Sequence, residues 1–333
     1  MTPSPTLNTI LITGGCGFIG TNLVKYLTQR HYKVRILDNL STPSSIWTTD
    51  PHSSPQPPLT QSTELLVGDI RDPEVINKAV EGIDAVVHLA ARASVVESLK
   101  NPKENWDANV NGTLNLLEAC RYKGIGKFIF ASSNAVLGEQ PPPVDESKIP
   151  RPLSLYGASK LAGEALCSTY YHSFGLNTIS LRFANCYGPH SEYNPSVLTR
   201  FMDWARQGKP LTVYGDGNQT RDFVHADDVC QAIHLALTAL ASGPKTQDFL
   251  LFQIASGVET SVNELADLIR KLAADHQISV IYEPRRKGEI ERNYSDINKA
   301  RKLLGFEPKI TLKAGLETLC KLTWLSTNQQ HTI

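Results

Sequence analysis

Thr13-Gly14-Gly15-Cys16-Gly17-Phe18-Ile19-Gly20 is the stretch of sequence that decides the fold. It lies between an apolar run, residues 10–12, and a helical pattern that begins near Thr21. Gly15, Gly17 and Gly20 satisfy the spacing G-x-G-x-x-G, in which the early glycines permit a tight turn and the last lets the helix pack on the strand. The first N–H groups of such a helix are unpaired and carry the positive end of its dipole. The stretch therefore predicts a cradle for a pyrophosphate.

A carboxylate follows at the end of a second apolar run. Residues 34–37 lead into Asp38, near the offset at which an acidic residue accepts a hydrogen bond from an adenosine ribose 2′-OH. The two motifs together favour a dinucleotide site. The alternative is an ordinary strand-to-helix turn with an acidic residue after it.

Composition excludes several classes of protein. The chain has 333 residues, with 33 Lys plus Arg and 33 Asp plus Glu, so the net charge is zero and no nucleic-acid partner or anionic membrane surface is predicted. The first residues lack the pattern of a signal peptide, and no apolar run is long enough for a membrane span, so we expect a cytoplasmic protein. The six cysteines show no C-x-x-C spacing, which predicts reduced, mostly buried thiols and no metal site.

Apolar runs of strand length alternate with helical patterns up to residue 184, among them a predicted helix over 102–123, and a later helical segment is expected over 265–274. This alternation predicts an α/β fold, a Rossmann-type doubly wound parallel sheet. We expect residues 1–184 to form the nucleotide-binding domain and residues 185–333 a smaller mixed α/β domain, with segments near 222–256 returning to the first. Residues 39–63 are rich in Ser, Thr and Pro and are expected to form a surface loop.

Three side chains are candidates for chemistry. Tyr156 and Lys160 are spaced i and i+4 at the start of a predicted helix, so they share one helix face. A phenol has a pKa of about 10, and a nearby ammonium together with a second positive charge would stabilise the phenolate enough for it to act as a base. Ser133 follows the predicted strand 127–131, at the carboxyl end where open α/β sheets bind ligands.

These motifs together resemble the extended short-chain dehydrogenase/reductase family, and within it the nucleotide-sugar epimerases of the UDP-glucose 4-epimerase type. The resemblance also rests on segments 88–91, 109–113, 185–189, 221–225 and 286–289, and it covers about residues 8–325. It implies an NAD-dependent isomerase with tightly held NAD, a UDP-sugar substrate and a homodimer.

The family's functional residues map onto this sequence position by position. The catalytic set implied by the resemblance is Ser133, Tyr156 and Lys160. The implied NAD-binding residues are Gly14, Gly17, Phe18, Ile19, Gly20, Asp38, Asn39, Asp69, Ile70, Leu89, Ala90, Ala91, Asn109, Tyr156 and Lys160. The implied substrate-binding residues are Ser133, Asn134, Tyr156, Asn185, Arg221, Arg286 and Asn293. His88 and His225 are expected to be structural.

Departures from the family pattern favour one reaction. Dehydratases of the family carry an Asp-Glu pair directly after the active-site hydroxyl residue, whereas this chain has Asn134-Ala135, which cannot titrate. Enzymes acting on UDP-hexuronic acids tend to place an arginine shortly after the Tyr-Gly-Pro segment, where this chain has His190-Ser191-Glu192. We therefore expect 4-epimerisation of UDP-glucose and UDP-galactose or their N-acetyl forms. The remaining alternatives are a hexuronate 4-epimerase, a nucleotide-sugar reductase and a non-catalytic NAD-binding protein.

Overall fold

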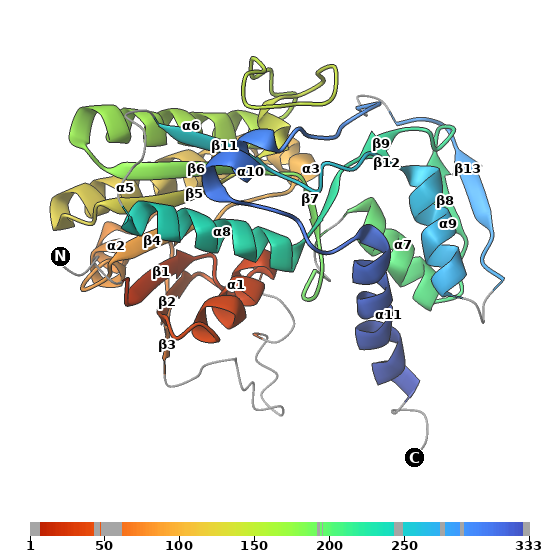
Figure 1. Cartoon of the computed structure of the whole chain (residues 1–333), viewed down its shortest axis with the longest axis horizontal. Helices are drawn as coiled ribbons and strands as arrows, with labels where there is room; N and C mark the ends of the chain where they lie inside the picture. Colours follow the sequence, from red (N-terminus) through yellow and green to blue (C-terminus); the bar gives the residue numbers. More distant parts are fainter. Residues whose placement is uncertain are drawn as a thin grey trace.

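The computed structural model describes residues 7–42, 47, 62–191, 194, 196–242, 249–273, 277–286 and 290–328. A seven-stranded, entirely parallel sheet forms its centre, in the order β11-β6-β5-β4-β1-β2-β3 (Figure 1). Its strands are β1 (Thr9–Thr13), β2 (Lys33–Asp38), β3 (Thr63–Val67), β4 (Ala85–His88), β5 (Lys127–Ser133), β6 (Asn177–Phe183) and β11 (Leu250–Ile254). The predicted α/β fold with a doubly wound parallel sheet is confirmed.

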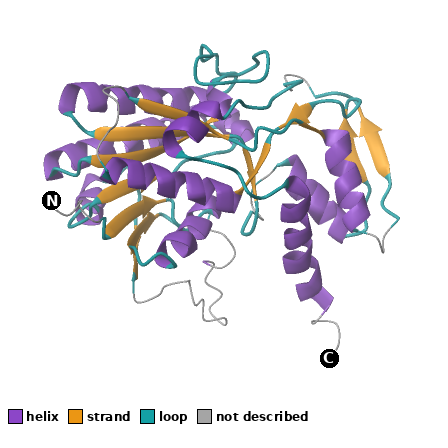
Figure 2. Ribbon diagram, viewed as in Figure 1, coloured by secondary structure: helices purple, strands orange, loops and turns teal. Residues whose placement is uncertain are grey.

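Helices cover both faces of this sheet (Figure 2). Side chains alternate along each strand, so Ile10 and Ile12 of β1 join one buried core while Leu11 joins the other. The helices beside the sheet are α1 (Phe18–Thr28), α2 (Pro73–Ala79), α5 (Gly112–Lys123), α6 (Leu155–Phe174), α8 (Ala226–Ala241) and α10 (Asn298–Leu304). Residues of α8, β11 and α10 thus pack into the first core although they follow residue 184.

A third core lies beside the sheet, at the right of Figure 1. It is built by α7 (Val197–Arg206), α9 (Val262–Leu272), α11 (Leu312–Asn328), β8 (Leu211–Tyr214) and β13 (Val280–Glu283). Two short strand pairs connect this part to the large sheet: β7 (Asn185–Tyr187) with β10 (Phe223–His225), and β9 (Thr220–Arg221) with β12 (Thr260–Ser261). The division into domains at residue 184 stays a prediction.

Local structure departs from the predicted elements at three places. The predicted helix over 102–123 is α4 (Pro102–Trp106), a π-helical turn (Asp107–Asn111) and then α5. The short helix α3 (Val95–Lys100) was not predicted. Helix α9 begins at Val262 instead of the predicted residue 265, because Ser261 and Glu264 form a capping box that satisfies the first backbone N–H groups.

The rest of the structure bears on three expectations. All six cysteines are unpaired, five are buried and Cys186 is half-buried, as predicted. Within the described ranges, no helix has the length and apolar character needed to cross a membrane. Most of the loop predicted over residues 39–63 lies outside the described residues.

Candidate active site

The glycine-rich turn packs too closely for side chains. Gly14 has φ +72°, and a Cβ added to it would lie 2.7 Å from the backbone nitrogen of Ala90. A Cβ at Gly15 would lie 2.6 Å from Cγ2 of Ile36, and one at Gly20 would overlap the carbonyl oxygen of Gly14. The turn between β1 and α1 is therefore too closely packed at these three positions for any residue larger than glycine.

The start of α1 is suited to an anion. Its first residues, Phe18 and Ile19, follow the N-cap residue Gly17, which has no side chain to cap the helix, and the first turn contains no acidic residue. Uncapped N–H groups and the positive end of the helix dipole favour a phosphate here. The donor set fits the pyrophosphate of a dinucleotide.

The Asp38 carboxylate lies directly beside this cradle at the end of β2. It accepts hydrogen bonds from the backbone N–H groups of Cys16 (2.9 Å) and Leu40 (2.8 Å). Burial raises its pKa. The contact with Cys16 places the carboxylate next to the glycine-rich turn, as a ribose-binding role requires.

Asn39 and Asp69 lie together at the same sheet edge. The Asn39 amide donates to Asp69 (2.9 Å), which also accepts two side-chain hydrogen bonds from Arg71 (2.8 and 2.9 Å). The Arg71 bonds hold the pKa of Asp69 far below its usual range. Ile70 is buried, and a Cβ on Gly112 of α5 would lie 2.6 Å from its Cδ1, so α5 lies close against it.

Residues 89–91 follow β4, the strand beside β1, and lie next to the glycine-rich turn. Leu89 N–H donates to the carbonyl of Thr13 (3.0 Å), and Ala90 N–H donates to the Thr13 hydroxyl (3.3 Å). Both bonds join the end of β4, which continues into Ala91, to the end of β1. The predicted cofactor residues of these two strands are thus neighbours in the structure.

Asn109 joins this region to α6. Its Oδ1 accepts from Arg92 N–H (2.8 Å), and its Nδ2 donates to the Ser159 hydroxyl (2.9 Å). Asn109 is buried in the π-helical turn, so it connects the loop after β4 with the helix that carries Tyr156.

Ser133, Tyr156 and Lys160 come together where β5 meets α6. Ser133 ends β5, and Tyr156 and Lys160 lie in the first turns of α6, whose start is capped by the Ser154 hydroxyl. Burial raises the pKa of Tyr156 to about 12, while its hydrogen bond with Ser133 acts in the opposite direction. The phenol is therefore protonated in this state, and a positive charge beside it would favour the phenolate.

Lys160 is buried and oriented toward the strand. Its Nζ donates to the carbonyl of Ala131 (2.8 Å) and lies 4.8 Å from the centroid of the Phe130 ring. Burial lowers its pKa to about 8. The ammonium form therefore predominates near neutral pH.

His88 and His225, both expected to be structural, form hydrogen bonds within the protein. His88 bonds through its two ring nitrogens to the hydroxyls of Thr13 (2.7 Å) and Thr113 (2.9 Å). Burial lowers its pKa to about 3, so the ring is neutral. His225 accepts from Asp227 N–H at the start of α8 (3.2 Å).

The residues predicted to hold the substrate lie on the second side of the site. Arg221 donates to the carbonyl of Ile290 (2.8 Å), and Asn293 N–H donates to Thr220 Oγ1 (3.4 Å), so β9 and the segment near 290–293 are neighbours. Arg286 is exposed, and its guanidinium carbon lies 3.6 Å from the centroid of the Tyr214 ring. Lys287, Gly288, Glu289 and Glu192 lie outside the described residues.

Asp222 is a buried neighbour of Arg221 that the sequence analysis does not single out. It is fully buried and accepts from the N–H groups of Ser256 (2.8 Å), Gly257 (3.0 Å) and Ser295 (3.2 Å). Its carbonyl accepts from Asn185 N–H (3.0 Å). Asp222 directly follows Arg221 in sequence, and this was the only signal available.

Asn134, the residue after Ser133, faces the same segment. It is buried, and its Nδ2 donates to the Ser295 hydroxyl (2.8 Å). A neutral amide therefore stands where a dehydratase of the family would place a carboxylate, and it connects the catalytic turn to residues 293–295.

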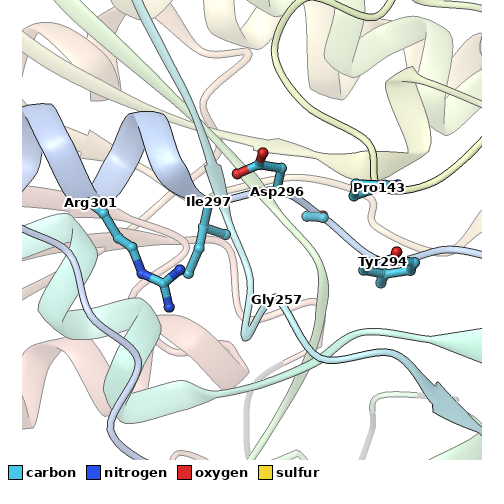
Figure 3. Close-up of a pocket in the computed structure, with 7 residues that line it drawn as sticks. Pro143, Gly257, Tyr294, Asp296, Ile297 and Arg301 are labelled. Carbon is cyan, nitrogen blue, oxygen red and sulfur yellow. The ribbon is translucent and has the colours of Figure 1, made fainter.

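A pocket of about 200 Å³ lies beside this segment (Figure 3). It is lined by Pro143, Gly257, Tyr294, Ser295, Asp296, Ile297 and Arg301. None of the predicted site residues lines it, but Ser295 joins it to Asn134 through the hydrogen bond given above.

Comparison with known proteins agrees with this geometry. The sequence model of the NAD dependent epimerase/dehydratase family matches residues 10–251. The chain belongs to this family. Membership confirms the predicted resemblance, the class of enzyme and the NAD cofactor.

Relatives within the family act on different sugars. A UDP-glucose 4-epimerase from Thermotoga maritima, solved with UDP-glucose, is 32% identical in sequence to this chain. The alignment covers 96% of this chain and 99% of that protein, with a TM-score of 0.85. A UDP-N-acetylglucosamine 4-epimerase from Methanobrevibacter ruminantium M1 is 30% identical in sequence; its alignment covers 97% of this chain and 99% of that protein, also with a TM-score of 0.85. A UDP-glucuronate 4-epimerase from Thermodesulfobacterium geofontis is 32% identical over 92% of this chain and 93% of its own.

Proposed function

We propose that this protein is an NAD-dependent UDP-hexose 4-epimerase that interconverts UDP-glucose and UDP-galactose and accepts their N-acetyl forms. The observation that carries the proposal is the meeting of Ser133, Tyr156 and Lys160 at the carboxyl end of β5, beside a cradle that fits a dinucleotide. UDP-sugar epimerases among the relatives make this chemistry the first choice.

NAD, when bound, supplies the acceptor and then the donor of the hydride at sugar C4. Tyr156 takes the proton of the 4-hydroxyl, directly or through Ser133, and later returns it. Lys160 stabilises the phenolate by its charge. The pocket would have to let the 4-keto sugar turn, so that its other face could take the hydride back while Tyr156 returns the proton.

On the cofactor side, the start of α1 would hold the pyrophosphate, Asp38 and Asn39 the adenosine ribose, and Asp69 and Ile70 the adenine. Residues 89–91 would lie along the dinucleotide, and Asn109 would brace this wall. On the substrate side, Asn185, Arg221 and Arg286 would bind the nucleotide diphosphate.

Asn134 supports epimerisation over dehydration, because a neutral amide bonded to Ser295 supplies neither an acid nor a base. Asn293 is half-buried on the substrate side. Its amide is shorter than a tyrosine side chain and leaves room near the sugar's C2 substituent, which is why N-acetyl forms are included.

The test is to incubate the purified protein with UDP-glucose, UDP-N-acetylglucosamine and UDP-glucuronate, without added NAD, and to separate the products by chromatography. A 4-epimer without net NADH formation supports the proposal. Conversion of UDP-glucuronate alone would assign a hexuronate epimerase, and stoichiometric oxidation or reduction of a sugar would assign a dehydrogenase or reductase. No conversion would leave the non-catalytic NAD-binding role.

We also propose that the protein is a homodimer paired through α5 and α6. Leu161 and Leu166 pack partly into cores of their own chain, so they contribute less to such a contact than their helix positions suggest. Trp106, Leu114 and Ala165 are exposed on this side and provide apolar surface instead. Sedimentation showing only monomer at micromolar concentration would reject the dimer.

A further inference from the structure

A buried ion pair lies between α6 and the sheet. Glu164 accepts from Arg182 through Nε (2.8 Å) and Nη2 (2.7 Å) in a bidentate arrangement. The two side chains are 6% and 3% exposed. Glu164 also accepts a hydrogen bond from the Ser132 hydroxyl.

This pair belongs to a regular series of contacts between α6 and β5. Ala131 accepts from Lys160, Ser132 donates to Glu164, and the next residue of β5, Ser133, bonds with Tyr156. Three consecutive strand residues thus contact three helix residues spaced i, i+4 and i+8. Positions with this spacing share one helix face, so the Glu164 contact holds α6 on β5 one turn beyond Lys160.

Stability alone does not account for the pair. Desolvating two charges offsets most of their attraction, and apolar residues of similar volume often serve as well or better. Among the described residues, Arg182 Nη1 and both amide atoms of the adjacent Gln253 have no hydrogen-bond partner. A pair selected only for stability would leave fewer buried polar atoms unsatisfied.

The Glu164 carboxylate also has an electrostatic effect on Lys160. Lys160 lies near Cys167 and Glu164 on its own helix and near neutral His88 on β4. Arg182 on β6 is already occupied by Glu164. Cys167 and Glu164 both act to raise the pKa of Lys160. Burial raises the pKa of the Cys167 thiol, which keeps it neutral, so the Glu164 carboxylate is the negative charge that favours the ammonium form.

We infer that Glu164 is a positioning residue, which holds α6 on β5 through Ser132 and Arg182 so that Ser133, Tyr156 and Lys160 keep their mutual arrangement. The inference rests on the proposed function. It assigns Glu164 no contact with substrate or cofactor.

Two variants separate geometry from charge. Glu164→Gln removes the carboxylate charge but keeps the side-chain shape. The double variant Glu164→Leu/Arg182→Met removes the pair together, which avoids an unpaired buried charge. Glu307→Gln is the matched control, because Glu307 makes the same kind of bidentate pair with Arg301 on the surface (2.8 and 3.0 Å).

We expect the double variant to melt cooperatively and to bind UDP-sugar with an unchanged KM, but with kcat lowered at least about tenfold. In Glu164→Gln, the alkaline limb of the kcat profile should move to lower pH, because Lys160 then loses its proton more readily. NMR of ¹³C-labelled lysine should show the same downward shift of the Lys160 titration in the NAD-loaded protein. The control should match the wild type.

A folded double variant with wild-type kcat would overturn the positioning role, as would an unshifted Lys160 titration in Glu164→Gln. Failure of both variants to fold would also overturn it, because the pair would then hold the fold itself. If the wild type epimerises no UDP-sugar, the proposed function fails, whereas the Lys160 titration still decides the electrostatic effect of Glu164.

Discussion

Gly163→Ala tests how closely α6 must approach β5. Gly163 lies on α6 between Lys160 and Glu164. A Cβ added there would overlap Cζ of Phe130 and lie 2.8 and 3.0 Å from its Cε1 and Cε2. Carbon atoms in contact are normally about 3.5–4.0 Å apart, so the ring or the helix must move by about 1 Å to relieve the overlap with Cζ.

The Phe130 ring has no space into which it can retreat. It is fully buried, with the His88 ring centroid 5.8 Å away and Lys160 Nζ 4.8 Å from its own centroid. Overpacking of this kind costs about 1–3 kcal/mol, whereas replacing a helical glycine by alanine gains about 1 kcal/mol. Because the ring is confined, we expect a net loss of about 1–2 kcal/mol.

For a chain of 333 residues, that loss corresponds to a melting temperature lower by about 1.5–3 °C. The larger effect should be on turnover, because a shift of α6 displaces Tyr156 and Lys160 from Ser133. Misplacement of reacting groups by about 1 Å can cost about 10²-fold, so we expect kcat to fall about 10- to 100-fold.

The assays are thermal melting by circular dichroism and kcat for the UDP-sugar that the wild type converts. Gly126→Ala is the control, since no atom lies within 4 Å of its added Cβ and its φ is not positive. This control should melt at or slightly above the wild-type temperature. If Gly163→Ala has the same melting temperature and the same kcat as Gly126→Ala, then neither stability nor turnover requires the close contact between α6 and β5.

Four further outcomes are expected. Tyr156→Phe should keep NAD and UDP-sugar binding but lower turnover at least about 10²-fold, and near-normal turnover would contradict its role as acid and base. The Asp38 carboxylate should select NAD over NADP, so equal affinities in a binding titration would reject its ribose contact. Asn293→Tyr should depress kcat/KM for an N-acetyl sugar at least about tenfold more than for the plain hexose, and equal effects would move Asn293 away from C2. Burial lowers the pKa of His88 to about 3, so below about pH 6.5 the unfolded chain binds a proton at this residue while the folded chain does not. The free energy of unfolding should therefore fall as the pH drops from about 6.5 toward 3. In His88→Gln, the urea midpoint should depend less steeply on pH over this range.

The sequence was sufficient to predict those parts of the site that depend on neighbouring residues. The glycine-rich turn and the i, i+4 pair Tyr156/Lys160 are local patterns, so the strand–turn–helix and the shared helix face followed from them. The parallel sheet followed from the alternation of apolar runs and helical patterns. Helix α3 was missed because six residues carry too little periodicity to distinguish a helix from a loop.

Contacts between distant segments could not be predicted in the same way. Asn134 and Ser295 are 161 positions apart, and neither belongs to a motif that points to the other. Glu164 and Arg182 are 18 apart, on a helix and a strand whose separate patterns place both in the interior but do not pair them. Which polar residues become partners depends on the packing of whole elements, which a single sequence does not specify.

The contacts of Asp222 and Asn134 join the proposed substrate-binding and catalytic residues in one hydrogen-bonded unit. Asp222 follows Arg221, accepts from Ser295 N–H (3.2 Å), and Ser295 in turn accepts from Asn134 (2.8 Å), the residue after Ser133. The Asp222 carboxylate and the Asn134 amide are both buried, so water cannot replace a hydrogen-bond partner that either of them loses. Leaving either group without its partner lowers the free energy of unfolding by about 1–3 kcal/mol. A substitution that displaces Arg221 therefore displaces the turn carrying Ser133 as well, and it should change kcat together with KM. A purely local binding residue would change KM alone.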